Sequence, residues 1–300
     1  MLELSRLRML VEAGHRGSIA AAAKELHLTP SAVSQQLKVL AQEVRIDLLE
    51  RVPGGVRLTA AGALLVEYAE RALGELEQAE QALAVFKGTV AGTLRVGCFP
   101  SAAGALLPSL LAGLASTYPD LTVTLHSLNS RDAVGALTAG EVDAAFVASY
   151  EEELPADGDL RTTVLGYDRL QAIAAPDHPL FQGERVELAD LRDEPWLMDA
   201  NSSVLCGVVT RACRRAGFAP RIRTHCPDAS VTLAMAQAGL GVAVLPRMVV
   251  SGHGVAALPT GPALGRSVGL VVRRSRLRLP AVQVLLEESV RLCSPVLEST

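Results

Sequence analysis

Residues 17–40, GSIAAAAKELHLTPSAVSQQLKVL, hold two apolar helical patterns with only three residues between them. Ser18 is a good N-cap for the first pattern, in which Ala20, Ala23 and Leu26 fall on one face. Small alanine side chains on that face let a second helix cross at close range. The stretch therefore predicts two short helices packed against each other and joined by a tight turn.

The second helix of this pair has two contrasting faces. Thr29 caps it and Pro30 takes its first position, where a missing N–H has no cost. Val33, Leu37 and Leu40 fall at i, i+4 and i+7 and are expected to face inward. The opposite face carries short hydrogen-bonding side chains and one lysine: Ser31, Ser34, Gln35 and Lys38. Such side chains can pair with base edges in the major groove, so we predict a helix-turn-helix; an ordinary solvated helix face is the alternative.

Residues 48–59, LLERVPGGVRLT, read as a strand, a Pro-Gly-Gly turn and a second strand, which is typical of a β-wing beside the helices. Arg51 and Arg57 flank the turn, where an arginine can enter the minor groove or bind phosphate. For Arg57, an ordinary surface arginine is an equally good interpretation. The predicted DNA-contacting residues are Ser18, Thr29, Pro30, Ser31, Ser34, Gln35, Lys38, Arg51 and Arg57.

A long third helix is predicted from Ala60 to about Phe86, after a capping Thr59. Its apolar residues alternate at spacings of four and three: Leu65, Ala69, Ala72, Leu76, Ala79, Leu83 and Phe86. This is a heptad seam, and the helix would reach roughly 40 Å. A helix of that length has little of its own chain to pack on, so we expect a second copy to pair along the seam. Packing on the rest of the same chain is the alternative.

Composition places the chain among folded globular proteins, because 49% of its residues are hydrophobic and 20% are charged. Three hundred residues suggest two or three domains. Residues 1–62 hold eight Lys/Arg and six Asp/Glu, so this head carries +2; since the whole chain carries −4, the remainder carries −6. A basic head on an acidic body suits contact with a polyanion at one end. The sequence has no apolar run of membrane length and does not start with an export signal, so we expect a cytoplasmic protein without membrane contact.

The sequence offers little support for catalysis or metal binding. Five widely spread cysteines, an odd number, argue against a disulfide framework. There is no Cys-x-x-Cys or paired-histidine spacing, no Gly-x-Ser-x-Gly, no phosphate-cradling loop and no paired carboxylates on one helix face. We therefore expect no catalytic residues, no metal site and no cofactor.

From Thr93 onward strands alternate with helices, a pattern that predicts parallel sheets with helical crossovers. About two hundred residues exceed one such sheet, so we expect two lobes joined by crossovers near 165 and 266. Open sheets bind ligands where strands end and helices begin. The turns of this kind contain Ser101, Asn129, Ser130, Ala148, Ser149, Ser202, Asp228 and Ala229, which are the predicted effector-binding residues.

Each serine in these turns could instead be a plain N-cap, the better interpretation of Ser203 and a competing one for Ser130. Ser101 is the strongest candidate. No Arg or Lys occupies the turns, although Arg131 adjoins one, so a small mono-acid, such as a carboxylate or amino acid, or a neutral metabolite fits better than a highly charged ligand. Asp228 leaves room for an amine.

These motifs together resemble the LysR-type transcriptional regulators. The resemblance is carried by Gly17-Ser18, Ala21 to Ala23, Leu28 to Leu40, Leu48 to Arg51 and Leu58 to Gly62, and in the body by APDHPL (175–180) and GLGVAVLP (239–246). The chain departs from the family pattern at Ala41 and Leu49, which are packing positions. The resemblance implies a mainly α winged helix-turn-helix head and linker helix, joined to a two-lobed α/β effector domain shaped like a periplasmic binding protein.

The resemblance further implies a regulator that binds an interrupted inverted repeat of double-stranded DNA as a homodimer or homotetramer and responds to a small molecule in the cleft between lobes. RNA polymerase is a further candidate partner. The expected domains are the head at 1–59, the dimerisation helix and hinge at 60–92, and the effector domain at 93–300, with lobe I at 93–165 and 267–300 and lobe II at 166–266.

Peroxide-sensing members of the same family form a disulfide in the second lobe, which suggests an alternative function. Cys213 falls where their second cysteine lies, whereas their first would align near Val204 and this chain has Cys206 instead. If both share one helix, seven residues separate them by roughly 10 Å of rise, too far for a bridge without local unfolding. Buried apolar cysteines are the simpler interpretation.

Overall fold

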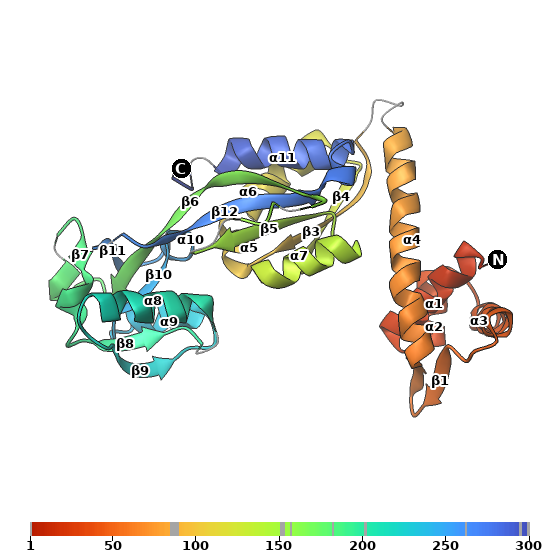
Figure 1. Ribbon diagram of the computed structural model, residues 1–300, viewed down its shortest axis with the longest axis horizontal. Coiled ribbons are helices and arrows are strands. Elements are labelled where there is room, and N and C mark those ends of the chain that lie inside the picture. Colours follow the sequence, from red (N-terminus) through yellow and green to blue (C-terminus); the bar gives the residue numbers. More distant parts are fainter. Residues whose placement is uncertain are drawn as a thin grey trace. The chain divides into compact units, whose positions relative to one another are not determined.

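The computed structural model describes residues 2–84, 90–150, 154–156, 158–181, 183–200, 203–261, 263–293 and 296–298. The chain divides near residue 90 into two compact units, a head with its stalk and a two-lobed body, which are described in turn (Figure 1). No helix in the described ranges combines the length and apolar character that crossing a membrane requires.

The head consists of three helices and a two-stranded wing: α1 (Leu4–Arg16), α2 (Ile19–Glu25), α3 (Pro30–Val44), β1 (Leu49–Val52) and β2 (Gly55–Leu58). Its core gathers apolar residues from every helix, among them Leu10 and the predicted inward residues of α3, Val33, Leu37 and Leu40. The predicted face of α2 is wrong at Ala20, which is exposed. Ala23 is buried as predicted, and Ala22 is buried in place of Ala20, because the inward face of α2 begins at Ile19.

The wing is attached to the turn between α1 and α2. The amide of Val56 donates to the carbonyl of Gly17 at 2.9 Å, and a Cβ on Gly55 would lie 2.0 Å from that oxygen. Only glycine therefore fits at Gly55. Gly54 turns the wing with φ near 90°, a conformation that favours glycine.

The stalk helix α4 (Ala60–Ala84) packs by its first half on the head itself. Val66 and Ala69 are buried there, Ala69 with 1% of its surface exposed, and Leu65 packs against the same core. The predicted seam is therefore wrong at Leu65 and Ala69, whose face meets α1 of the same chain. An exposed apolar stripe runs along α4 through Leu64, Tyr68, Ala72, Leu76, Ala79 and Leu83. Phe86 of the predicted seam lies outside the described residues.

Lobe I of the body is built on one mixed sheet in the order β4-β3-β5-β12-β6. Its strands are β3 (Gly92–Cys98), β4 (Leu121–Ser127), β5 (Ala144–Ser149), β6 (Leu160–Ala174) and β12 (Gly265–Arg273). Helices α5 (Pro100–Ala105), α6 (Leu107–Thr117), α7 (Ser130–Ala139) and α11 (Pro280–Cys293) accompany it, with a 3₁₀ turn at Arg274–Arg276. α6 and α11 cover one face of the sheet and α7 the other (Figure 1).

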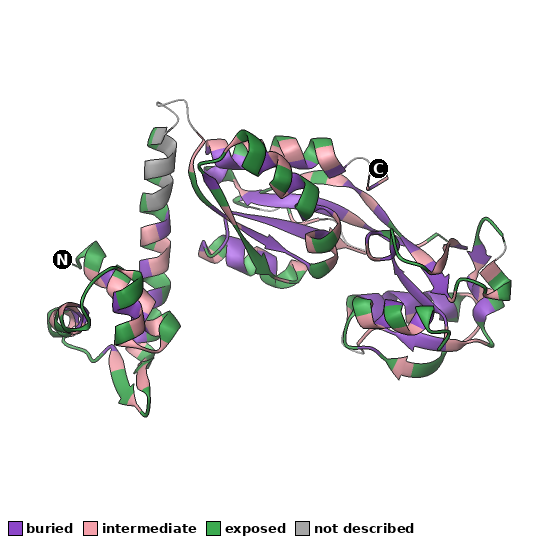
Figure 2. Cartoon of the chain, turned by 180° about the vertical axis from the view of Figure 1, so that it is seen from behind, coloured by how far each residue is buried: buried purple, intermediate pink, exposed green. Residues whose placement is uncertain are grey.

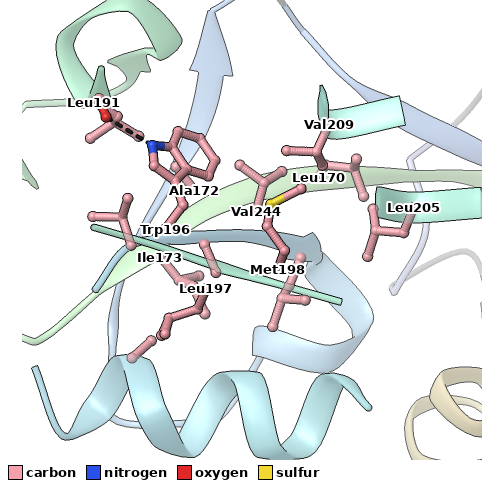
Figure 3. Close-up of a cluster of buried hydrophobic side chains, with 14 of the residues drawn as sticks. Leu170, Ala172, Ile173, Leu191, Trp196, Leu197, Met198, Leu205, Val209 and Val244 are labelled. Carbon is pink, nitrogen blue, oxygen red and sulfur yellow. Dashed lines mark hydrogen bonds between the residues drawn. The ribbon is translucent and has the colours of Figure 1, made fainter. Parts of the chain in front are cut away.

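Lobe II continues from β6, which pairs with β12 as far as Arg169 and with β10 and β11 from Leu170 onward. Its remaining elements are β7 (Val186–Glu187), β8 (Pro195–Met198), β9 (Arg221–His225), β10 (Ala243–Pro246), β11 (Ala256–Gly261), α8 (Val204–Arg215), α9 (Ala229–Gln237) and α10 (Arg247–Val250), with 3₁₀ turns at Pro179–Phe181 and Leu188–Leu191. Trp196 is fully buried in the core of this lobe, and its indole N–H donates to the carbonyl of Leu191 at 2.9 Å (Figure 3). Buried residues run along the strands of both lobes (Figure 2).

Two sequence-based expectations about the body need correction. The sheet is parallel only among β3, β4 and β5; the two crossover strands β6 and β12 run antiparallel to their neighbours in lobe I. The run GALLPSLLAGLASTYP (104–119) predicts a single helix, whereas the structure has two helices in this region, α5 and α6, which meet at Leu106. Pro108 explains that break, because it lacks the N–H that would continue the hydrogen-bond ladder.

Candidate functional site

The polar face of α3, formed by Ser31, Ser34, Gln35 and Lys38, is accessible to solvent, as its sequence pattern predicts. Thr29 caps the helix, its hydroxyl accepting from the amide of Ala32 at 3.3 Å, and Pro30 begins it. Ser18 caps α2 in the same way, accepting from Ala21. On the outer face of α3, Ser34 is half-buried, and Ser31, Gln35 and Lys38 are exposed. Donors and acceptors therefore point outward at the spacing of one helix face.

The two adjacent glutamines of α3, Gln35 and Gln36, lie in different environments. Arg6 of α1 donates to the Gln36 side-chain oxygen at 2.8 Å and pairs with Glu43 at 2.6 Å, so Gln36 holds α3 to α1. Gln35 points away from this contact. Gln36 therefore stabilises the packing of α3 on α1, whereas Gln35 is exposed. The sequence pattern does not distinguish these two roles.

Acidic neighbours neutralise some of the basic residues of the head. Arg16 pairs with Glu12 and Glu25, and Arg57 pairs with Glu50 across the wing at 2.8 Å. That pair supports the interpretation of Arg57 as a surface arginine, although an exposed pair is weak and can open on DNA. Among the described residues of the head, the lysines and arginines that form no ion pair with an acidic residue are Arg8, Lys24, Lys38, Arg45 and Arg51. Lys38 and Arg51 of the predicted contacts are thus available for phosphate.

A buried charge cluster lies where the two lobes meet. Arg266 of β12 and Asp168 of β6 are cross-strand partners, and both are buried, with 6% and 1% of their surfaces exposed. The guanidinium donates to Asp168 Oδ2 from Nε at 3.0 Å and from Nη2 at 2.8 Å. This is a two-bond, charge-assisted pair between adjacent crossover strands.

The cluster connects both lobes. On the lobe I side, Arg266 Nη2 donates to the hydroxyl of Ser101 at 2.7 Å, Nη1 approaches that of Tyr150 at 3.4 Å, and the guanidinium lies 4.8 Å from the ring centre of Phe99. On the lobe II side, Asp168 Oδ1 accepts from the amide of Met248 at 3.2 Å. One ion pair therefore spans the contact between lobes.

Burial governs the titration of this cluster. It raises the pKa of Asp168 above its ordinary value, while Arg266 acts in the opposite direction. Burial likewise raises the pKa of Tyr150. The Tyr150 hydroxyl therefore stays protonated at neutral pH and can donate as well as accept.

The other predicted effector-binding residues occupy separate places. The hydroxyl of Ser130 accepts from the amide of Ala148 at 2.8 Å, which joins the start of α7 to the end of β5. Asn129 caps α7, and Asp228 caps α9, where hydrogen bonds from Ser230 and Val231 lower its pKa. Ser149 ends β5 beside Tyr150, Ala229 packs on the lobe II core, and Ser202 lies outside the described residues.

Sequence reasoning missed Arg266, Asp168 and Tyr150. No arginine occupies the predicted turns in the sequence, but Arg266 reaches Ser101 in the fold. Both charged residues fall just before apolar runs that predict strands, LQAIAAP (170–176) and SVGLVVRR (267–274), and so outside the elements expected from the sequence. A charge inside the extended strands GYDRL and GRSVGLVV would have been the signal.

All five cysteines are free and buried. Cys206 and Cys213 do share α8, so the helix rise keeps their sulfurs apart as the spacing predicts. Burial raises the pKa of Cys213 to about 12, despite three nearby arginines in sequence. The thiol is therefore protonated and unreactive at neutral pH. Among the described residues, no group of histidine, cysteine and carboxylate side chains could hold a metal ion.

We expect stability to fall in alkali through Cys213. Its thiol ionises near pH 9 when unfolded and near 12 when folded, so its contribution is complete below about pH 9 and is lost as the pH rises toward 12. Urea unfolding at pH 8 and at pH 10.5 should show a smaller decrease in the free energy of unfolding for Cys213→Ala than for the parent. Equal decreases in both proteins would contradict the assignment.

A winged head with an open polar helix, a long stalk and a two-lobed α/β body define a DNA-binding transcriptional regulator with a ligand-responsive domain. The chain matches the model of the bacterial regulatory helix-turn-helix protein, lysR family, over residues 4–63 and that of the LysR substrate binding domain over 87–294. It belongs to the LysR family, whose members are regulators and not enzymes.

Relatives agree over nearly the whole chain. The transcriptional dual regulator GltC of Bacillus subtilis is 25% identical over 297 residues, 98% of each protein. The HTH-type transcriptional regulator CbbR of Xanthobacter flavus is 32% identical over 257 residues, 85% of this chain and 74% of CbbR. The structure of full-length OxyR C199D from Pseudomonas aeruginosa has a TM-score of 0.76 and 26% identity, covering 98% of this chain and 96% of OxyR. LysR regulators bind DNA and small-molecule effectors and form oligomers.

Proposed function

We propose that this LysR-type regulator binds an interrupted inverted repeat with two α3 helices, held apart by paired α4 helices, and that a small molecule between the lobes changes their spacing. The observation that carries this proposal is the open face of α3, on which Ser31, Gln35 and Lys38 are exposed while Gln36 is held by Arg6. The exposed side chains of this face can meet base edges, and the hydroxyl of Ser31 also bonds to that of Thr29 at 3.1 Å. The action takes place with the chromosome in the cytoplasm, and RNA polymerase is a proposed further partner.

The proposed dimer uses the exposed stripe of α4, which consists of Leu64, Tyr68, Ala72, Leu76, Ala79 and Leu83. Leu83 is 63% exposed, an unfavourable state for a leucine without a partner. From Ala72 to Leu83 the residues of the stripe are spaced by four, three and four, as paired helices require. A tetramer would need further contacts from the body.

We also propose the domain limits given by the sequence. The head ends at 59, the dimerisation helix and hinge end at 92 and the effector domain ends at 300, with the lobes meeting at 165 and 266.

The small molecule is proposed to bind near Ser101, where lobe I meets the charge cluster. We do not extend the proposal to redox sensing, because Cys206 and Cys213 are both buried and lie on one helix.

We expect the double variant Ser34→Ala, Gln35→Ala to lose preference for its operator more than total affinity for DNA. Each lost base contact should cost about 1–3 kcal/mol of discrimination. Affinity for scrambled DNA should change little, because phosphate contacts dominate it. Operator fragments selected from genomic DNA, followed by titration of matched and scrambled duplexes at fixed salt, would measure both.

Gln42→Ala is the matched control, since Gln42 is an exposed glutamine near the other end of α3. It should leave the specificity ratio unchanged. Equal losses on matched and scrambled duplexes in the double variant would mean that another element reads the bases.

A further inference from the structure

The two edges of the Arg266 guanidinium face different acceptors. The edge formed by Nε and Nη2 is held by the carboxylate of Asp168. The edge formed by Nη1 and Nη2 faces two neutral hydroxyls, that of Ser101 at 2.7 Å and that of Tyr150 at 3.4 Å. The second contact is at the long limit of a hydrogen bond. The edge toward lobe I is therefore held much less firmly than the edge toward Asp168.

A carboxylate is the better acceptor for that edge. Its two oxygens match the spacing of two parallel guanidinium N–H groups, and its negative charge adds a Coulomb attraction to the guanidinium that a neutral hydroxyl oxygen lacks. The hydroxyls of Ser101 and Tyr150 could both rotate and donate to such a carboxylate, since each hydroxyl is a donor as well as an acceptor. The guanidinium edge and the two hydroxyls beside it can thus together donate hydrogen bonds to both oxygens of a carboxylate.

We propose that the Nη1–Nη2 edge of Arg266 recognises the carboxylate of a small monocarboxylate effector, which takes the place of the Ser101 and Tyr150 oxygens around the guanidinium. This deepens the proposed function, on which it depends only for the existence of an effector. It makes Arg266 the specificity-determining residue of the interlobe site.

The charges around Asp168 select this class of ligand. A neutral ligand would exchange the bonds from the guanidinium to neutral hydroxyl oxygens for others of the same kind and would gain little. A ligand with several negative charges would meet Asp168, which already balances Arg266. A second cation, Arg247, also acts on Asp168 and helps to offset one further negative charge. One carboxylate therefore fits the balance.

Replacement of the Ser101 and Tyr150 oxygens by a carboxylate would also change the contact between the lobes. Ser101, Phe99 and Tyr150 belong to lobe I, whereas Asp168 is fixed to the amide of Met248 in α10 of lobe II. A carboxylate placed between Arg266 and the two hydroxyls alters the polar bonds that cross from one lobe to the other. Binding at this edge is thereby coupled to the arrangement of the lobes.

The test compares acids with their amides on the full-length protein. Acetate, butyrate, pyruvate and benzoate, and the primary amide of each, are titrated at constant ionic strength while the unfolding temperature and binding heat are followed. We expect at least one carboxylate to bind saturably and its amide not to bind. Arg266→Lys, which keeps the charge and loses the two-pronged edge, should weaken that binding by about tenfold or more. Tyr150→Phe and Ser101→Ala should weaken it by smaller factors.

Arg169→Lys is the matched control, because Arg169 neighbours Asp168 on β6 but pairs with Glu298 at the surface. It should bind as the parent does. Equal binding of acids and amides, no saturable binding of any carboxylate, or unchanged binding by folded Arg266→Lys would overturn the proposal. Operator binding by the unliganded parent is measured in parallel, and its absence would contradict the proposed function and leave the carboxylate result standing.

Discussion

Replacing Arg266 by alanine is expected to lower the free energy of unfolding of the body by about 3–5 kcal/mol, because Asp168 would remain buried without its counter-ion. The carboxylate keeps one amide bond from Met248, which does not balance a full charge. Urea unfolding followed by the fluorescence of Trp196, the one tryptophan of the sequence, measures this directly, since Trp196 is buried in lobe II.

A double variant separates the loss of the pair from the cost of an unpaired charge. Arg266→Met combined with Asp168→Leu removes both charges and keeps much of the volume, so it should recover most of the lost stability. Asp168→Leu alone should again be strongly destabilising. A single alanine variant as stable as the parent would contradict the buried position of the pair.

The double variant Leu76→Glu, Leu83→Glu is expected to convert the regulator to a monomer and to weaken operator binding by about 10²–10⁴-fold. Both leucines are exposed on the stripe of α4, so glutamate costs the isolated chain little. In the proposed dimer, however, the charges would lie in an apolar seam. Loss of pairing removes the advantage of binding two half-sites at once, which accounts for the size of the effect. Analytical ultracentrifugation and operator titration measure the two quantities.

Leu76→Met with Leu83→Met is the control for the stalk, because it keeps both side chains apolar and flexible. It should remain a dimer and bind DNA as the parent does. If the glutamate variant sediments as a dimer, the stripe is not the interface and the seam has to be sought elsewhere.

The head could be predicted closely from its sequence because its signals are local. Thr29 and Pro30 mark the start of α3 within its first turn, and Gly54 marks the tip of the wing. Periodicity also predicts which residues of α3 are buried. It fails where two partners compete for one helix: Leu65 and Ala69 fit the heptad pattern, but α1 of the same chain buries their face.

The interlobe cluster could not be predicted because it depends on distant pairing. Ser101 and Arg266 are 165 residues apart in sequence, and Asp168 and Arg266 are 98 apart. They meet only because β12 pairs antiparallel with β6 at the point where β6 leaves lobe I for lobe II, an arrangement that alternating strands and helices do not predict. The turn at Ser101 could be recognised as a strand end, whereas its arginine partner could not.

The burial of Val66 and Ala69 in the head core means that the first half of the stalk is packed directly onto the head. The 25 residues of α4 extend over roughly 37 Å. A rotation of the stalk helix would therefore turn α3 with it. In a dimer, the angle between the two stalk helices would set the distance between the two DNA half-sites that the α3 helices can contact.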